Sequence, residues 1–473
     1  MCGIFGAVLA EGIKPGNLAL MAVEGLGTEG SGLIGSDGNS KGHFKVIKNC
    51  GLIIEVFKEK EVQKLNDCVV LLGHNRYSTA GMKDAINCLQ PFLVYTMVGP
   101  IAIAHNGELV DAQQQRKIVL KSGVALSTDT DSELIAQLLS MSIAKNAENL
   151  VNGSNFADIS QEIANMMKKL YLSYSLIVMT FDRLYALRDP YGNRPICVAK
   201  IFAKEKPAYF VASESCAFPS TAQSLYELKP GEIMEISRKG IRCIQQIKPA
   251  APSFCIFEYV YFARADSILE GQQVYSVRKE CGRILADEVN IKGDIVSNVP
   301  DSAVAASLGF AEKSGIKYME VLHRNSYIGR SFIQPSTELR KNSILRKFGV
   351  IRKNVAGKKI ILIDDSIVRG NTMGIIVHLL KEYGAKEVHV CIASPPIKFP
   401  CYMGINISSK EELIASTKTN EEIAKKLNAD SVWYLSVEGL KKAITKGIHR
   451  KFDRKIGYCT ACLTGQYPVD LNW

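Results

Sequence analysis

The second position of the chain is a cysteine, in the segment Met1-Cys2-Gly3-Ile4-Phe5-Gly6. Removal of the initiator methionine would leave Cys2 with a free α-amino group beside its thiol. An α-amine titrates near neutrality, with a pKa of roughly 7.7–8.0, so it can act as a general base for the thiol. A thiol beside a base is the arrangement used in covalent acyl transfer. The segment therefore predicts a nucleophile, although Cys at position two also occurs in proteins where it has no catalytic role.

Three further segments contain residues that could complete an amide-hydrolysing site. Arg76 follows an apolar run and can pair in bidentate fashion with a substrate carboxylate. Asn106 and Gly107 follow a second apolar run, and an Asn amide beside a glycine N–H can form an oxyanion hole. Asp131 precedes a helical run. Its carboxylate can hold an α-ammonium group, or it can simply cap the helix.

The order of these segments, with two further motifs at 188–195 and 213–215, resembles the class II glutamine amidotransferase domain. In that family an N-terminal cysteine releases ammonia from glutamine. The resemblance covers the first half of the chain. It implies that Cys2 is the nucleophile, that Arg76 and Asp131 bind glutamine, and that Asn106 and Gly107 form the oxyanion hole.

A second set of polar residues follows an apolar strand expected at 359–363. Asp364 and Asp365 end this run, and paired acids can hold ribose hydroxyls or a magnesium ion. A short turn and a helix come next, and backbone N–H groups at such a position can bind phosphate. The residues of the turn and helix start that could contact a phosphorylated substrate are Ser366, Arg369, Gly370, Asn371 and Thr372.

The run 359–372 resembles the phosphoribosyl-pyrophosphate loop of type I phosphoribosyltransferases. Segments at 257–264, 299–302, 327–335 and 384–388 narrow the resemblance to the amidophosphoribosyltransferases, and it then covers nearly the whole chain. It implies that ammonia released at Cys2 displaces pyrophosphate from 5-phosphoribosyl 1-pyrophosphate. The product would be 5-phosphoribosylamine, in the first step of de novo purine biosynthesis.

The same resemblance implies a cofactor and partners. One Mg²⁺ per subunit would be bound through Ser302, Asp364 and Asp365. Glutamine and 5-phosphoribosyl 1-pyrophosphate are the implied substrates, and purine nucleotides are the implied feedback inhibitors. A homo-oligomer, either a tetramer or a dimer, is also expected.

The chain contains 13 cysteines, and one pair has the spacing Cys459-Thr460-Ala461-Cys462. A C-x-x-C pair is a metal half-site or a redox pair, and the spacing alone does not choose between them. Cys255 and Cys401 complete a set of four that matches the [4Fe–4S] ligands in the cluster-bearing branch of the resembled family. Four thiolates suit such a cluster. Zinc is the chemical competitor, and a site without metal is the third alternative.

Charge and hydropathy exclude some classes of partner. The net charge is +11 and the sequence pI is about 8.9, but the basic residues are scattered and no nucleic-acid motif is present. A solvated basic surface, which can also steer phosphorylated substrates, explains the charge. The sequence shows no targeting segment and no apolar stretch long enough to span a bilayer. These features predict a cytoplasmic protein that has no membrane or nucleic-acid partner.

Two domains of mixed α+β and α/β class must position these residues. We expect the amidotransferase domain at 2–248, where short apolar runs predict strands, one of them at 52–54. The resemblance implies the four-layer αββα sandwich of N-terminal-nucleophile hydrolases. Residues 249–253 are rich in proline and alanine and predict the boundary. Beyond them, at 254–473, strands alternate with helices, which predicts a doubly wound parallel sheet.

The sequence departs from the family pattern in several places. Leu26 replaces an arginine that lines the glutamine pocket, and Thr28 replaces a glutamine of the same run. Ser326 replaces a basic residue of a pyrophosphate loop. Replacing an arginine by Leu26 removes a planar cation that can donate several hydrogen bonds, so the change is not conservative. Two alternatives to the coupled enzyme therefore stay open: a transferase that uses only free ammonia, and a non-catalytic paralogue that binds phosphoribosyl pyrophosphate or nucleotides.

Overall fold

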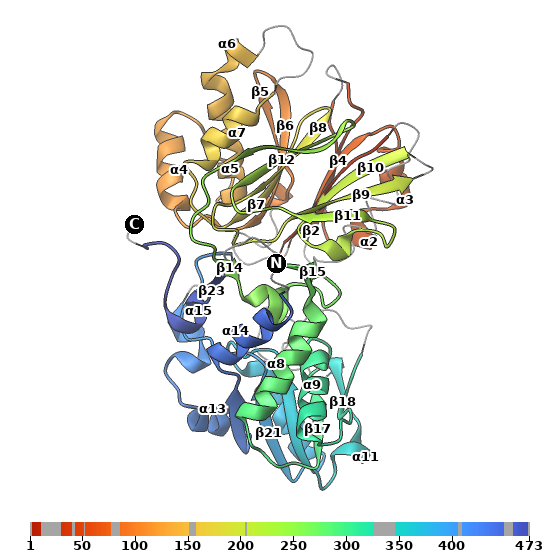
Figure 1. Cartoon of the computed structure of the whole chain (residues 1–473), viewed down its shortest axis with the longest axis vertical. Helices are drawn as coiled ribbons and strands as arrows, with labels where there is room; N and C mark the ends of the chain where they lie inside the picture. The colour runs from red at the N-terminus through yellow and green to blue at the C-terminus, as the bar shows by residue number, and fades with distance from the viewer. Residues whose placement is uncertain are drawn as a thin grey trace.

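The structure is a computed structural model that describes residues 2–10, 30–39, 43–51, 53–76, 86–150, 158–203, 206–325, 346–404, 409–448 and 457–471. Leu26, Thr28 and Ser326 lie outside the described residues. Figure 1 shows two domains stacked along the long axis, with the chain's first residues at the junction between them. None of the helices described is long and apolar enough to cross a membrane.

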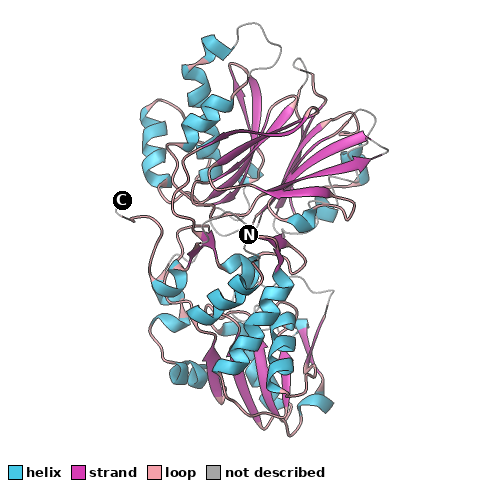
Figure 2. Cartoon of the chain, viewed as in Figure 1, coloured by secondary structure: helices cyan, strands magenta, loops and turns pink. Residues whose placement is uncertain are grey.

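The N-terminal domain is built on two antiparallel sheets that face each other (Figures 1 and 2). The first sheet has the strand order β11 (Gln223–Glu227), β9 (Cys197–Ala203), β10 (Lys206–Ala212), β1 (Gly3–Val8), β4 (Val70–Arg76), β2 (Gly30–Ser36) and β3 (Lys45–Cys50). The second has the order β13 (Gly240–Gln246), β12 (Glu232–Ser237), β8 (Arg183–Arg188), β7 (Tyr174–Met179), β6 (Gly99–Gly107) and β5 (Phe92–Thr96).

Strand alternation explains the layering, because successive side chains of a strand point to opposite faces. In β1, Ile4 and Val8 enter the core between the sheets, whereas Phe5 and Ala7 enter the core on the outer face. Helices cover both outer faces, so the domain has four layers. The first sheet carries α2 (Ile53–Val56) and α3 (Glu59–Gln63); the second carries α4 (Ala112–Lys121), α5 (Asp131–Lys145), α6 (Ala147–Leu150) and α7 (Ser160–Met167). The predicted αββα sandwich is confirmed.

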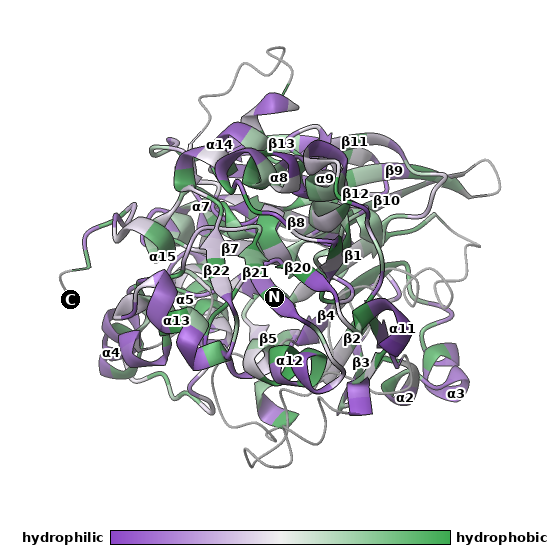
Figure 3. Ribbon diagram, turned by 90° about the horizontal axis from the view of Figure 1, so that it is seen from below, coloured by the Kyte–Doolittle hydropathy of each residue, from purple (hydrophilic) through white to green (hydrophobic). Residues whose placement is uncertain are grey.

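The strand expected at 52–54 is wrong, because Ile53–Val56 forms the helix α2. Ile53, Val56 and Phe57 are buried against the first sheet, and their spacing of three and four residues is helical. A short apolar run is compatible with either a strand or a buried helix turn, and here packing decides the outcome. The peripheral helices α3 and α11 (Arg352–Val355) are largely hydrophilic in Figure 3.

The C-terminal domain contains a parallel sheet with the order β17 (Ile295–Asn298), β20 (Lys359–Asp364), β21 (Glu387–Ile392) and β22 (Ser431–Tyr434). The helices α8 (Val274–Glu288), α9 (Val304–Ser314) and α14 (Val437–Lys446) pack on one face. The helices α12 (Asn371–Glu382) and α13 (Asn420–Leu427) pack on the other. Helices on both faces of a parallel sheet confirm the predicted α/β class.

Short elements frame this sheet. They are β14 (Phe254–Cys255) paired with β23 (Tyr458–Cys459), β15 (Ile268–Leu269) paired with β16 (Gln272–Gln273), β18 (Leu322–Arg324) paired with β19 (Phe348–Val350), the π-helix η3 (Glu258–Phe262), and α15 (Ala461–Thr464). Short 3₁₀ turns occur at η1 (Ile86–Cys88), η2 (Ser215–Ala217), η5 (Lys410–Glu412) and η6 (Ile414–Ser416). The expected boundary segment 249–253 lies between β13 and β14.

Polar contacts join the two domains at the junction. The buried Glu214 accepts hydrogen bonds from the Arg264 N–H at 2.8 Å and from the Ser267 hydroxyl at 2.7 Å. Arg194 forms an ion pair with Glu258 at 3.0 Å, and neither side chain is more than 2% exposed. A buried, hydrogen-bonded interface of this kind fixes the orientation of one domain on the other.

Candidate active sites

Cys2 immediately precedes β1, a central strand of the first sheet. The first residue of β1, Gly3, pairs with Asn75 of β4, so Cys2 lies at the same end of the sheet as Arg76. The Ser213 N–H donates to Ile4 O at 3.0 Å, and the Ile4 N–H donates to the Ser213 hydroxyl at 3.3 Å. The sheet therefore holds the predicted nucleophile and the predicted carboxylate-binding arginine on adjacent strands.

The two predicted oxyanion-hole residues end β6 in the facing sheet. Gly107 has φ of +146°, and a Cβ there would lie 2.1 Å from Ser173 O, so only glycine fits. Asn106 is 3% exposed, and its Oδ1 has no hydrogen-bond partner among the described residues. A buried polar atom without a partner is uncommon in a stable fold and marks a candidate functional group.

Asp131 is the first residue of α5, but Thr130 is the residue that caps the helix, accepting the Glu133 N–H. One carboxylate oxygen of Asp131 accepts the Leu109 N–H at 2.9 Å, and the other lies 3.6 Å from His105 Nδ1. Burial raises the pKa of Asp131, but His105 and the Leu109 N–H outweigh burial and lower it overall. The fold thus brings an ionised carboxylate next to the strand end that carries Asn106 and Gly107.

Two buried histidines beside this site were not among the predicted residues. His105 accepts or donates a hydrogen bond through Nδ1 to the Ser132 hydroxyl at 3.0 Å. Burial, then the nearby His105 and Arg76, lower the pKa of His74 to about 3, so its ring is neutral. The sequence did offer a signal for them, because His74 stands two residues before Arg76 and His105 stands directly before Asn106.

The second predicted site lies at the end of β20, which finishes with Asp364. Asp365 is buried, and its carboxylate accepts a hydrogen bond from the Ser366 hydroxyl at 2.5 Å and one from Ser302. Burial and the neighbouring Asp365 charge raise the pKa of Asp364 well above its usual range. The three residues predicted to bind magnesium are therefore adjacent, and no cation among the described residues forms an ion pair with the two carboxylates.

The turn after these acids leads directly into the start of a helix. Gly370 has φ of +80° and stands at the N-cap of α12, whose first residues are Asn371 and Thr372. Arg369 in the same turn forms an ion pair with Glu412. The N-terminal N–H groups of α12 have no partner within the helix and carry its positive dipole end, which favours an anion.

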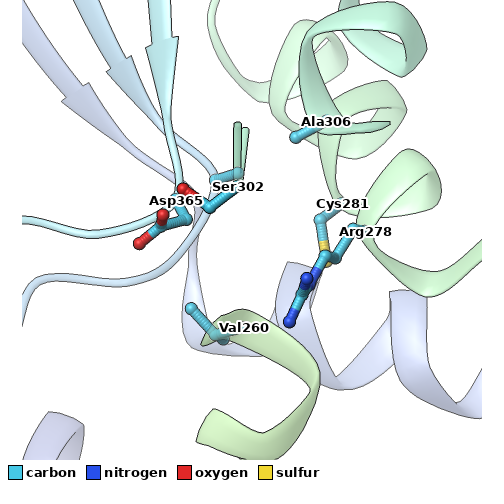
Figure 4. Close-up of a pocket in the computed structure, with 7 residues that line it drawn as sticks. Val260, Arg278, Cys281, Ser302, Ala306 and Asp365 are labelled. Atoms are coloured by element: carbon cyan, nitrogen blue, oxygen red, sulfur yellow. The ribbon is translucent and has the colours of Figure 1, made fainter. Parts of the chain in front are cut away.

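A small cavity lies beside Asp365, and Figure 4 shows Asp365 and Ser302 on one side of it and Arg278 from α8 on the other. Arg278 is 7% exposed and donates to Tyr259 O at 2.8 Å and to Ala263 O at 2.7 Å. Its charge partly opposes the burial that raises the pKa of Asp365. Arg278 was not predicted, because only the fold places α8 next to the acid pair.

The four predicted metal-binding cysteines, hereafter the thiol site (Cys255, Cys401, Cys459 and Cys462), meet at the junction of the domains. Cys255 and Cys459 face each other in the parallel pairing of β14 with β23. The carbonyl of Cys462 accepts the N–H groups of Lys398 and Phe399, shortly before Cys401, at 2.9 and 3.1 Å.

The thiols of this site interact electrostatically with one another. Burial raises the pKa of Cys255 to about 12 and that of Cys459 to about 11. The neighbouring cysteine thiolates raise both pKa values further, and the Arg194 charge lowers them. Over the part of the chain that the structure describes, no three His, Cys, Asp or Glu side chains converge on a site for one metal ion. The fold therefore brings the four cysteines into one region, with Cys255 and Cys462 buried and Cys401 and Cys459 half-buried, and the described residues form no compact single-ion cage.

Comparisons with known proteins agree with both halves of the chain. A glutamine amidotransferase domain model matches residues 74–220, and a phosphoribosyl transferase domain model matches residues 297–395. The mouse amidophosphoribosyltransferase is 46% identical over all of this chain and 98% of its own length. The Drosophila melanogaster protein of the same name is 48% identical over 100% of this chain and 90% of its own.

Solved structures match over the same extent. The Bacillus subtilis glutamine phosphoribosylpyrophosphate amidotransferase complexed with ADP and GMP has a TM-score of 0.85 and 38% identity, with 99% of this chain and 98% of that chain covered. Fold and sites thus define a two-domain protein that joins a glutamine amidotransferase domain to a phosphoribosyltransferase domain. The chain belongs to the amidophosphoribosyltransferase family.

Proposed function

We propose that this protein is a glutamine-dependent amidophosphoribosyltransferase. It hydrolyses glutamine to glutamate and ammonia, and the ammonia displaces pyrophosphate from C1 of 5-phosphoribosyl 1-pyrophosphate to give 5-phosphoribosylamine. This reaction is the first step of de novo purine biosynthesis. The observation that carries the proposal is the presence of both sites in one chain, with Cys2 at the junction that leads to the transferase domain.

The chemistry of the first half-reaction follows from the placement of five residues. The α-amine of Cys2 takes the thiol proton, and the sulfur attacks the glutamine amide carbon. The oxyanion that forms is stabilised by the Asn106 amide and the Gly107 N–H, while the proton passes to the departing ammonia. Water then hydrolyses the thioester and releases glutamate. Arg76 binds the substrate carboxylate, and the ionised Asp131 binds its α-ammonium group.

The second half-reaction is assigned to the turn after β20. The N–H groups at the start of α12 hold a phosphate of the substrate, with Ser366, Arg369, Gly370, Asn371 and Thr372 around it. Ser302, Asp364 and Asp365 fit a magnesium ion, because hard oxygen donors are adjacent and no described cation forms an ion pair with the two acids. When bound, Mg²⁺ neutralises charge on the pyrophosphate. The residues themselves orient C1 towards the incoming ammonia.

The thiol site fits a [4Fe–4S] cluster, which we assign as a structural cofactor. In support, four cysteines from three separate segments lie in one region, two of them buried and two half-buried, and such a cluster takes four thiolates. Zinc is the competing occupant, since four thiolates also satisfy it. Bound here, the cluster would link the start of the transferase domain to its last described strand.

Replacement of Cys459 by serine tests the thiol site. We expect the variant to lose most of its iron and acid-labile sulfide, and to unfold at a lower temperature, because one of four ligands is gone. Metal and sulfide analysis of anaerobically purified protein measures the first effect, and a thermal melt measures the second. Cys243→Ser, at an exposed position in β13, is the matched control. Unchanged iron in the Cys459 variant would remove the assignment, and zinc without sulfide would replace it.

Regulation by purine nucleotides extends the proposal. The Bacillus subtilis relative was solved with ADP and GMP, and a second solved relative, with a TM-score of 0.86, is described as the allosteric regulatory enzyme of purine biosynthesis. Nucleotides resemble the phosphoribosyl substrate in carrying a ribose phosphate, so the turn at Gly370 suits both. A homo-oligomer and a cytoplasmic location complete the proposal.

The activity itself is tested by pyrophosphate release from 5-phosphoribosyl 1-pyrophosphate and Mg²⁺. The assay is run once with glutamine, and once with ammonium at high pH, where more of it is ammonia. Release with both nitrogen sources is expected. Release with ammonium alone would locate the defect in glutamine use, and would direct attention to the sequence departures at Leu26 and Thr28. Absence of release with either would identify a binding paralogue.

A further inference from the structure

Arg194 is a fully buried cation at the junction of the two domains, and its exposed fraction is 0%. It follows β8 in the glutaminase domain, but most of its hydrogen-bond partners lie in the transferase domain. Nη1 pairs with Glu258 at 3.0 Å, and Nη2 donates to Met403 O. Nε donates to the hydroxyl of Ser173, within its own domain, at 3.2 Å. All three nitrogens of one guanidinium are therefore occupied, across three segments far apart in sequence.

The Ser173 partner leads directly to the proposed oxyanion hole. Its backbone N–H donates to Glu108 O at 2.8 Å, and its carbonyl accepts the Glu108 N–H at 2.9 Å. The same carbonyl is the atom against which Gly107 is packed. Ser173 thus fixes the end of β6 through two backbone hydrogen bonds. Its own hydroxyl accepts from Arg194 Nε and donates to Asn193 Oδ1 at 2.8 Å.

The transferase partners of Arg194 are equally well defined. Glu258 begins the π-helix η3, and Met403 lies two residues after Cys401 of the thiol site. The next residue, Gly404, donates its N–H to the Glu108 carboxylate. A Cβ at Gly404 would lie 2.5 Å from Arg194 Nη2, and its φ is +112°. The loop at Cys401 therefore contacts the strand end of the oxyanion hole both directly and through Arg194.

A purely structural interface does not require a buried charge here. Burying an ion pair carries a desolvation penalty that apolar side chains of similar volume avoid. The planar guanidinium fixes the relative positions of its three acceptors, because its N–H groups point in set directions. Such precise placement is needed at an oxyanion hole, where a small displacement of a donor lowers the reaction rate.

We propose that Arg194 is a positioning residue for glutamine hydrolysis. It holds the strand end that carries Asn106 and Gly107 in place, using Glu258 and Met403 of the transferase domain as anchors. The inference rests on the proposed function and deepens it, because it makes the geometry of the oxyanion hole depend on the transferase domain. Arg194 touches no reacting atom; it acts through Ser173 and through the loop at Met403 and Gly404.

Ser173→Ala is the first test, because it removes the acceptor of Arg194 Nε and leaves the Arg194–Glu258 pair in place. It also removes the hydrogen bond that the Ser173 hydroxyl donates to Asn193 Oδ1 at 2.8 Å, so it is interpreted together with Gly404→Ala, which keeps that hydroxyl. Glutamate release should show a kcat lowered by about tenfold or more, with the KM for glutamine within about twofold, because oxyanion donors act in the transition state. Ammonia-dependent pyrophosphate release should be unchanged. Ser36→Ala is the matched control. It removes a different buried hydroxyl of the same domain, one that donates a hydrogen bond to the backbone carbonyl of Phe181 at 2.8 Å.

Gly404→Ala provides a second test that keeps every charge in the junction. The added methyl group must displace the guanidinium, so the same fall in kcat at constant KM is expected. Gly349→Ala is its control, since the nearest atom to a Cβ there is 3.9 Å away.

An unchanged kcat in both Ser173→Ala and Gly404→Ala overturns the inference. So does a change confined to KM, or a parallel loss of the ammonia-dependent reaction. Failure of the proposed function is recognised separately, as absence of pyrophosphate release by the unmodified protein, while glutamate release still tests Arg194.

Discussion

Replacement of Cys2 by alanine will abolish pyrophosphate release with glutamine and leave release with ammonium intact. The variant has no sulfur at position 2 to form the thioester. The acid pair and the turn at Gly370 are built from a separate sheet, so they keep their geometry. Residual glutamine-dependent activity should fall by several orders of magnitude, as it does when a covalent nucleophile is removed.

The measurement is initial-rate pyrophosphate release with each nitrogen source, on protein whose fold has been checked by circular dichroism. Cys50→Ala, an exposed cysteine of β3 in the same domain, is the matched control and should behave as the unmodified protein. Equal loss of both activities in Cys2→Ala would contradict the division of labour between the two sites. Retention of glutamine use would show that Cys2 is not the nucleophile.

Replacement of Asp364 by asparagine will remove pyrophosphate release with either nitrogen source. The substitution halves the negative charge offered to magnesium and to the substrate's ribose, while its size is unchanged. The same substitution should raise the thermal stability of the unliganded protein at neutral pH. Burial and the charge of Asp365 raise the pKa of Asp364, so the ionised carboxyl opposes folding.

The sign of this stability effect depends on pH. A group whose pKa is higher in the folded protein binds protons more tightly there, so stability falls as pH rises from the usual Asp range towards the raised pKa. The asparagine variant lacks this loss. Its melting temperature should therefore exceed that of the unmodified protein at neutral pH and approach it in acid. Asp287→Asn, at an exposed carboxylate of α8 that pairs with Lys313, is the control for both measurements. A lower melting temperature of the asparagine variant at neutral pH would contradict the prediction that the ionised Asp364 destabilises the fold.

The residues found from the sequence are those at the ends of strands within recognisable segments. Cys2, Arg76 and Asp364 each border an apolar run that the structure confirms as a strand. Such a position predicts exposure at the edge of a sheet, and the residue type then indicates the chemistry. Strand and helix periodicity also gave the class of both domains. At 52–54 the apolar run predicted a strand, but Ile53–Val56 forms the helix α2, because so short a run does not distinguish a strand from a helix.

The residues that were missed owe their roles to contacts between distant segments. Arg194 and Met403 are 209 positions apart, and Ser173 is joined to Arg194 only because β7 and the loop after β8 meet at the junction. His74 is buried and neutral, so its type carries no sign of function in the sequence. Arg278 faces Asp365 only after α8 has packed on the sheet. Tertiary placement, rather than residue type, defines this second group.

The pairing of β14 with β23 also sets an order of events during translation. Cys255 leaves the ribosome early in the synthesis of the transferase domain, but its strand partner Cys459 follows only after the whole parallel sheet has been made. Domains fold largely as their residues emerge, so the glutaminase sheets can assemble before Cys459 and Cys462 have been synthesised. The cluster proposed for the thiol site could therefore be completed only after nearly the whole chain has been made.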